Sequence, residues 1–120
     1  MLAREFRIAA DKDIKRILKL GKRLSCPECT LYFVPNTVGH PRVCVVVAAG
    51  VSKRAVVRNR VKRQAREVLR VAIQNKELSH AIDIVLMIRQ PAAKIIDGER
   101  PEVFKNFFIK TGLFSKQKQV

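Results

Sequence analysis

The sequence predicts an α+β fold: a single two-layer sandwich in which three helices pack on a small central sheet. Segments with helical periodicity alternate with short β-branched runs, in the order helix, strand, strand, helix, strand, helix. The chain has 120 residues, the length of one domain, and 48% of them are hydrophobic, enough for one core. Residues 1–120 are therefore expected to form one domain, with residues 115–120 as a frayed basic tail.

The first half of the chain predicts one helix and two strands. In Asp11–Leu20, apolar residues recur on one helix face and a glycine follows the last residue: Ile14, Ile17, Leu18 and Gly21. Residues 30–34 and 43–47 are rich in β-branched and aromatic residues, which predict strands. Turn formers fill residues 35–41 between them, so the two strands are expected to form an antiparallel hairpin.

The second half predicts a long helix, a strand and a final helix. Over residues 58–76 the apolar positions share one face: Val61, Ala65, Val68 and Ala72. The apolar run Ile82–Ile88 predicts a strand at the centre of the sheet. The long helix before it allows this strand to lie parallel to residues 43–47. Residues 90–101 are predicted as a loop, and residues 102–114 as a helix with an apolar face of Val103, Phe107 and Phe114.

The net charge restricts the partners of the protein. It is +15 at pH 7, from 25 basic and 10 acidic residues, and such a field attracts polyanions. Nucleic acid is the first candidate and an anionic membrane surface the second. The longest uncharged apolar run, residues 43–51, is far shorter than the about 20 residues of a membrane-spanning helix. Charges near the N-terminus argue against a signal peptide, so a cytoplasmic location is expected.

One segment carries much of this charge. Residues 52–70 hold eight Lys or Arg and one Glu, which is +7 in 19 residues. At about 100° per residue, five of its side chains share one arc of the predicted helix, away from the apolar arc: Asn59, Lys62, Arg63, Arg66 and Arg70. Solvated helix faces usually mix charges of both signs, and this one does not. The planar guanidinium fork fits phosphate oxygens, so the segment favours binding to a polyanion.

The same segment resembles the signature of a known family, the bacterial ribonuclease P protein component. Residues 55–63 are Ala-Val-Val-Arg-Asn-Arg-Val-Lys-Arg, and Arg66-Glu67 follows. The Arg-Asn-Arg run with these basic residues behind it is specific. Arg7-Ile8, Tyr32 and Arg89-Gln90-Pro91 support the resemblance, which extends over about residues 7–115.

This resemblance implies a protein that carries no catalytic residue and assists a catalytic RNA. In that family the RNA holds Mg²⁺ and cleaves the 5′ leader from precursor tRNA by hydrolysis. The protein binds both the catalytic RNA and the leader. The resemblance therefore implies two RNA partners, no cofactor in the protein itself, no membrane and no small-molecule substrate. It also implies that the helical crossover between the two parallel strands is left-handed.

The resemblance and the basic segment together give two sets of candidate site residues. The family motif matches Arg58, Asn59, Arg60, Lys62, Arg63 and Arg66, and the basic segment adds Lys53, Arg54 and Arg70. A leader-binding cleft, lined in the family by the first helix and the sheet, has four candidates here: Ile14, Leu18, Tyr32 and Arg89. A core position for Tyr32 stays an equal alternative.

The chain departs from the family pattern at two places. Residues 48–50, Ala-Ala-Gly, stand where the family usually has Ser-Lys-Lys. Ile14 and Leu18 stand where it often has aromatic residues. Stacking of a base on an aromatic ring contributes about 1–3 kcal/mol, so weaker binding of the leader by the first helix is expected.

Cysteines and histidines suggest zinc only weakly. Cys26 and Cys29 are spaced Cys-x-x-Cys, with His40 and Cys44 downstream, but a structural site needs four convergent ligands. Cys44 lies in an apolar strand, where a free cysteine packs as a small hydrophobe. A strand, not a helix, follows the pair, which disfavours a redox motif. We expect unliganded cysteines, and no metal or catalytic site in the protein.

Two other functions stay open at this stage. The first is a structural RNA-binding protein of the ribosomal type, which composition alone does not separate from a ribonuclease P subunit. The second is a helix-turn-helix DNA-binding protein with residues 58–76 in a major groove. The strand predicted at residues 43–47 leaves no room for the short helix that this motif needs.

Overall fold

The computed structural model describes residues 2–78 and 81–114. Its sheet has the strand order β1-β2-β4-β3, made of β1 (Lys22–Ser25), β2 (Cys29–Pro35), β3 (Arg42–Val47) and β4 (Ile82–Ile88). The helices are α1 (Asp11–Leu20), α2 (Ala55–Gln74), the short α3 (Gln90–Ala93) and α4 (Arg100–Lys110). Two 3₁₀ turns complete the fold, η1 (Arg4–Phe6) and η2 (Ala49–Val51). The predicted α+β class is confirmed.

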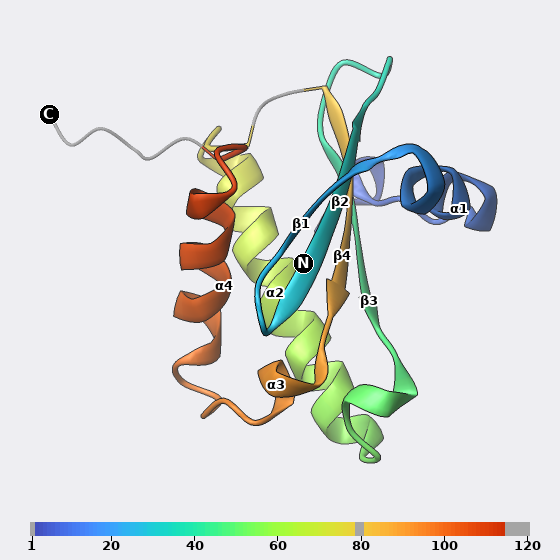
Figure 1. Ribbon diagram of the computed structural model, residues 1–120. Helices are drawn as coiled ribbons and strands as arrows, with labels where there is room; N and C mark the ends of the chain where they lie inside the picture. The colour runs from blue at the N-terminus through green and yellow to red at the C-terminus, as the bar shows by residue number, and fades with distance from the viewer. Residues whose placement is uncertain (1, 79–80, 115–120) are drawn as a thin grey trace, which may run out of the picture.

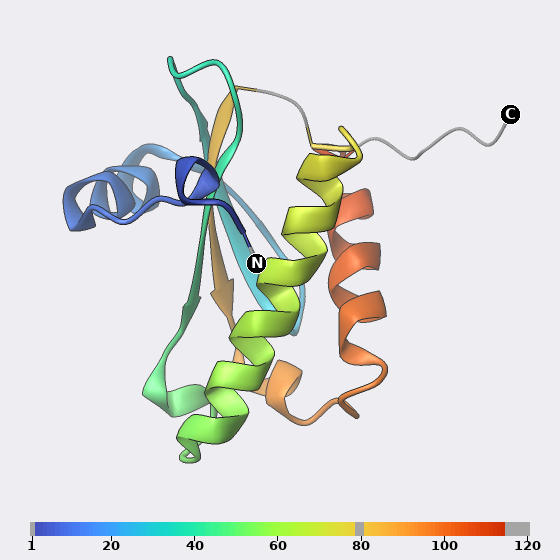
Figure 2. The ribbon, with the colours of Figure 1, turned by 180° about the vertical axis from the view of Figure 1, so that it is seen from behind.

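The two faces of the sheet are covered unequally. Helices α2 and α4 lie on one face and α1 on the other (Figures 1 and 2). Along β4, Ile84 and Leu86 belong to the main core with α2 and α4, whereas Val85 packs with Ile17 of α1. This alternation is the period of two that a strand imposes. The sheet with α2 and α4 forms the predicted sandwich, and α1 adds a partial third layer.

The predicted hairpin between residues 30–34 and 43–47 is wrong. Strand β4 lies between β2 and β3, pairing antiparallel with β2 and parallel with β3. The apolar β4 is buried on both faces and takes the centre, so the loop after β2 crosses two strand spacings, about 10 Å. The predicted parallel pairing of residues 43–47 with Ile82–Ile88 is confirmed.

Other differences concern one strand and one short helix that were not predicted, and the ends of the longer helices. Strand β1 was not predicted, because all four of its residues are exposed and no apolar alternation marks it. Helix α2 begins three residues earlier than predicted and ends at Gln74. The predicted loop contains α3, and α4 begins at Arg100 because Pro101 suits the first turn of a helix. The predicted tail, residues 115–120, lies outside the described residues.

The last helix is also shorter than predicted, although its aromatic packing continues beyond it. Phe104, Phe107 and Phe108 are its buried aromatic residues, and Val103 is only half-buried. Phe114 follows the end of α4 and is still buried, because its ring stacks on Phe108 with centroids 5.0 Å apart.

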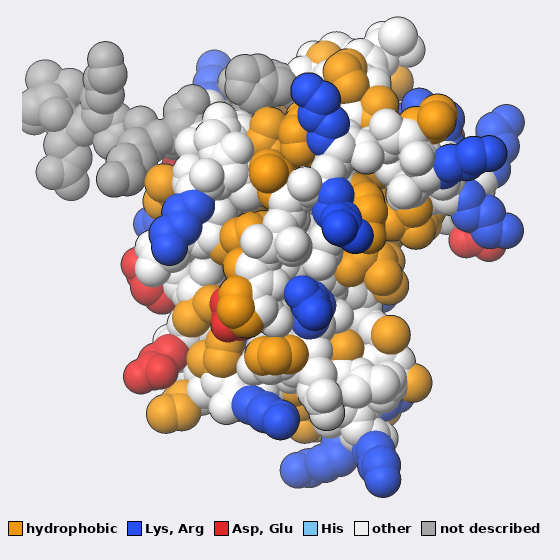
Figure 3. Space-filling model, in the orientation of Figure 1, with side chains coloured by type: hydrophobic (Ala, Val, Ile, Leu, Met, Phe, Trp, Pro, Cys, Tyr) orange, Lys and Arg blue, Asp and Glu red, His pale blue; other side chains and the backbone are white. Residues whose placement is uncertain are grey.

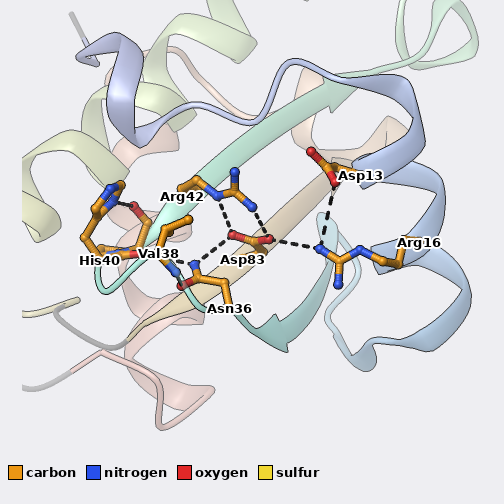
Figure 4. A network of polar contacts seen from close by, with 8 residues as sticks. Asp13, Arg16, Asn36, Val38, His40, Arg42 and Asp83 are labelled. Atoms are coloured by element: carbon orange, nitrogen blue, oxygen red, sulfur yellow. Dashed lines mark hydrogen bonds and ion pairs between the residues drawn. The ribbon is translucent and has the colours of Figure 1, made fainter.

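A buried carboxylate joins α1 to the sheet (Figure 4). Asp83 of β4 is 0% exposed. It accepts hydrogen bonds from Nε and Nη2 of Arg42 at 2.9 and 2.7 Å, and from Nδ2 of Asn36 at 2.8 Å. Arg16 of α1 donates to the same carboxylate at 3.4 Å. Burial alone raises the pKa of Asp83, but the hydrogen bonds from Arg42 and Asn36 outweigh it and hold the pKa below its usual value.

Replacing this carboxylate is expected to destabilise the fold. Asp83→Asn leaves Arg42 without its buried partner, and we expect a loss of about 3–5 kcal/mol in the free energy of unfolding. Because the pKa of Asp83 is lower in the folded state than in the unfolded state, its stabilisation is complete above about pH 4–5 and is lost as pH falls through the folded pKa. Urea denaturation at pH 7 and pH 3 measures both effects.

The control for this variant is Glu67→Gln. Glu67 pairs with Arg70 on the surface of α2, where an ion pair contributes less than about 1 kcal/mol. The difference in stability between wild type and Asp83→Asn is expected to shrink at pH 3. Equal losses for the two variants at pH 7 would contradict a special role for the buried carboxylate.

Candidate nucleic-acid interface

The basic residues are presented by α2, which packs on β3 and α4. Its buried positions form one stripe: Val61, Ala65, Leu69 and Ala72. Alanine, arginine and lysine favour helix, so the sequence of α2 suits both its length and its charge. Asn59 and Arg63 are exposed on the opposite arc, and Lys62 and Arg66 are half-buried beside the stripe. The amphipathic division predicted from periodicity is therefore present.

Three of the predicted RNA-binding side chains have partners within the protein. Arg60 forms an ion pair with Asp97 at 2.8 Å. Arg70 binds Glu67 through Nε at 3.0 Å, and Nη1 of Arg58 donates to the backbone oxygen of Ser52 at 2.7 Å. Within residues 2–78 and 81–114, none of the other predicted cations of this segment forms an ion pair: Lys53, Arg54, Lys62, Arg63 and Arg66. These five are free to meet phosphates.

The charges are distributed unevenly over the surface. Basic side chains gather at the lower edge of Figure 3, over the start of α2, and acidic ones on the side of α3 and α4. On that acidic side, the Arg100 and Arg60 guanidiniums hold the pKa of Asp97 below its usual value, with Arg100 acting most strongly. Arg70 likewise lowers the pKa of Glu67 through its hydrogen bonds. Lys62 and Arg66, which form no ion pair with the described residues, lie on the α2 side that borders the N-terminal segment and β3.

A basic cleft lies between the N-terminal segment, α1, β3 and α2, and its cavity volume is about 400 Å³. Four cations line it: Arg4, Arg7, Lys62 and Arg66. Its apolar lining includes Ile14, Val43 and Cys44. Burial raises the pKa of the Cys44 thiol, while Lys62 and Arg66, which line the same cleft, act in the opposite direction.

Sequence reasoning missed the contribution of Arg4 and Arg7. They reach the cleft because Arg7 forms a parallel bridge with Val43, and the N–H of Ile8 donates to the oxygen of Val43 at 2.9 Å. This bridge attaches the N-terminal segment to the edge of β3. Arg7-Ile8 supported the family resemblance, but nothing in the sequence indicates that this segment pairs with β3.

The sheet face beneath α1 continues from the basic cleft. Tyr32, Val85 and Cys44 are directly paired neighbours on β2, β4 and β3. Two strand spacings separate Tyr32 from Cys44, about 10 Å. Tyr32 is half-buried against the cluster formed by Ile17 and Val85, so the ring is partly core and partly surface.

The four predicted leader-cleft residues are not all brought together. Ile14 lines the basic cleft, and Tyr32 lies across the sheet from it. Leu18 is 37% exposed on α1. Arg89 follows the last residue of β4, about 20 Å along the strand from the end that α1 covers. Any ligand that touches all four must extend along the whole sheet.

The predicted absence of a metal site stays a prediction, and the four suggested ligands do not converge. Cys29 belongs to the main core on the α2 face, whereas Cys44 packs on the α1 face. The His40 ring meets Phe6 edge-on, with centroids 5.2 Å apart. In the described part of the chain, no group of three or more His, Cys, Asp or Glu residues is arranged to hold a metal ion. No helix there is long and apolar enough to cross a membrane.

Comparison with known proteins places these features in context. The family model of ribonuclease P matches residues 2–111. The ribonuclease P protein component of Photorhabdus laumondii is 36% identical over 92 residues, which cover 77% of this chain and 75% of the relative. That of Proteus mirabilis is 34% identical over 100 residues, 83% of this chain and 82% of the relative.

Solved structures agree with these sequence similarities. The ribonuclease P protein of Staphylococcus aureus has a TM-score of 0.82 and 27% identity, covering 92% of this chain and 98% of that one. The ribonuclease P protein of Thermotoga maritima has a TM-score of 0.69 at 24% identity, covering 83% of this chain and 96% of that one, and shows the same fold.

Proposed function

This chain belongs to the family of bacterial ribonuclease P protein components, and from that premise we propose that its α2 surface binds the catalytic RNA while the adjoining cleft binds the 5′ leader of precursor tRNA. As a member of the family, it is the protein component of a ribonucleoprotein that processes tRNA. Hydrolysis is assigned to the RNA and its Mg²⁺, and positioning of the substrate to the protein.

The single observation that carries the proposal is the position of Lys62 and Arg66. Both residues belong to α2, yet both also line the basic cleft. A strand of RNA in the cleft therefore meets the same helix that presents Asn59 and Arg63 to the outside. One helix serves two polyanions, and its charge lowers the repulsion between them.

The catalytic RNA is assigned to the exposed arc and the start of α2. Lys53, Arg54, Asn59 and Arg63 are exposed there, and an arginine fork binds a phosphate through two parallel hydrogen bonds. Residues 48–50, which replace the usual Ser-Lys-Lys, lie at η2 directly before these cations. We infer that Lys53 and Arg54 take over part of the phosphate binding that those lysines would provide.

The leader is assigned to the basic cleft and to the sheet face beyond it. The cations of the cleft suit a phosphodiester backbone, and Tyr32 offers a ring about 10 Å away across the sheet. Ile14 supplies an aliphatic wall. Such a surface binds single strands by charge and stacking, because every base has a stacking face.

The alternative functions lose their support. A helix-turn-helix needs a helix before the recognition helix, and β3 with the three-residue turn η2 precedes α2 instead. A ribosomal-type structural role shares the charge and the fold class, but the family match over residues 2–111 favours ribonuclease P.

Reconstitution tests the proposed function. An affinity-tagged chain is expected to retain the catalytic RNA of ribonuclease P from a cell extract in preference to ribosomal RNA. The chain alone is expected to leave precursor tRNA intact. Added to the catalytic RNA, it is expected to lower the Mg²⁺ concentration needed for cleavage, because its charge offsets repulsion between the two RNAs. Cleavage by the chain alone, or an unchanged Mg²⁺ requirement, would refute the division of roles.

Removal of single charges tests the α2 surface. If the segment engages six to eight phosphates, the logarithm of the RNA affinity falls against the logarithm of salt concentration with a slope of about −4 to −7. Arg63→Gln or Arg66→Gln is expected to weaken binding and to reduce that slope by about 1, with the fold unchanged.

The matched control removes a charge elsewhere. Lys105→Gln alters an exposed cation of α4, on the side away from the cleft, and is expected to leave both affinity and slope unchanged. Circular dichroism reports the fold of each variant. A wild-type slope near −1, or equal effects of Arg66→Gln and Lys105→Gln, would contradict an interface on α2.

The leader site is tested at Tyr32. If a base stacks on this ring, Tyr32→Ala is expected to weaken binding of precursor tRNA by about 1–3 kcal/mol and to leave mature tRNA unaffected. Tyr32→Phe keeps the ring and is expected to bind both substrates as wild type does. Affinity measurements of the holoenzyme for the two substrates distinguish the outcomes. Equal losses for precursor and mature tRNA would place Tyr32 in the core alone.

A further inference from the structure

Cys26 and Cys29 are in contact, and neither of them lines the basic cleft or belongs to α2. Their Sγ atoms lie 3.6 Å apart across the turn between β1 and β2. A backbone hydrogen bond of 2.9 Å from the N–H of Cys26 to the oxygen of Cys29 closes this turn. A disulfide needs sulfur atoms about 2 Å apart. Both side chains already face each other, so bond formation needs the Sγ–Sγ distance to shorten from 3.6 Å to about 2 Å.

The two thiols differ in accessibility. Cys26 is half-buried, whereas Cys29 is 0% exposed in the main core. Burial, followed by the neighbouring Cys26 and Glu28, raises the pKa of the Cys29 thiol, and Arg89 opposes this effect. In thiol–disulfide exchange the thiolate attacks, and the more accessible thiol reacts first with an external disulfide. Cys26 is thus suited to attack first, and the 3.6 Å contact, not a readily formed thiolate, makes Cys29 the residue that resolves the product.

Although the strand after the pair disfavours a redox motif, the contact between the two sulfur atoms supports one, and we propose that Cys26 and Cys29 form a dithiol–disulfide site that small-molecule disulfides such as oxidised glutathione oxidise reversibly. The Cys26 thiolate attacks one sulfur of the small disulfide, which forms a mixed disulfide and releases one thiol. Cys29 then loses its proton and attacks Sγ of Cys26, which forms the intramolecular bond and releases the second thiol. The protein dithiol is oxidised, the small disulfide is reduced, and its two thiols take up the two protons.

Closure of this bond acts on Arg89. The backbone N–H of Arg89 donates to the oxygen of Glu28 at 2.8 Å, and its Nη1 donates to the oxygen of Cys26 at 3.5 Å. Both acceptors belong to the turn that the disulfide closes. A cross-link restricts the open forms of such a turn, so oxidation holds the backbone of Arg89 more firmly. Arg89 is also one of the four leader-cleft candidates, but the disulfide does not depend on that role.

Mass spectrometry of the full chain with excess oxidised glutathione tests the site. The expected main product of the wild type lacks the mass of two hydrogen atoms and keeps one free thiol, Cys44. Cys29→Ser is expected to stop at a glutathione adduct on Cys26, and Cys26→Ser to form neither product. Cys44→Ser is the matched control and is expected to close the ring as the wild type does. Persistent glutathione adducts on wild-type Cys26, without ring closure, would overturn the proposal.

Amide hydrogen exchange tests the structural consequence. The N–H of Arg89 is expected to exchange several-fold more slowly in the oxidised chain, and reduction with dithiothreitol is expected to restore the original rate. Equal exchange rates in the two forms would overturn the effect on Arg89. Oxidation that a reductant does not reverse would overturn the proposed reversibility.

Discussion

The buried charge of Asp83 is the constraint on which the arrangement of α1, the sheet and the basic cleft depends. Its carboxylate receives hydrogen bonds from β3 through Arg42, from the end of β2 through Asn36, and from α1 through Arg16. A buried carboxylate without partners would cost several kcal/mol, so the three donors must stay together. Because α1 otherwise packs on the sheet mainly through Ile17, this contact fixes the position of the helix that carries Ile14 into the basic cleft.

A second buried charge organises the opposite side of the molecule. Arg100 is 2% exposed, and it donates to the oxygens of Ala92 and Ile95 at 2.9 and 2.7 Å. It also donates to Gln64 of α2 at 2.8 Å. These bonds satisfy the carbonyls at the end of α3 and hold the following loop against α2, where Asp97 pairs with Arg60. Through Gln64 and Arg60 these contacts commit one side of α2 to the fold, and the side that lines the basic cleft stays open to ligands.

Sequence patterns predicted those helices and strands whose hydrophobic periodicity matches their burial in the structure. The α2 division into apolar and basic arcs and the central position of β4 were predicted because periodicity and burial coincide there. Strand β1 has four exposed residues, and its pairing with β2 is the only reason it is a strand. The separation of β2 from β3, which were expected to form a hairpin, is a tertiary choice that no local pattern contains. Arg4 and Arg7 were missed for the same reason, because one bridge to Val43 brings them to α2.

The composition of the cleft limits what it can recognise. Its charged groups, Lys62 and Arg66 among them, suit phosphate oxygens, which every nucleotide carries. Its apolar lining, including Ile14 and Val43, offers bases no hydrogen-bond donors or acceptors from side chains. Sequence-specific recognition of single-stranded RNA depends on hydrogen bonds to base edges, and stacking on a ring such as Tyr32 accepts any base. A surface built in this way suits the proposed leader site, because it distinguishes the presence of a single strand from its absence and accepts any base.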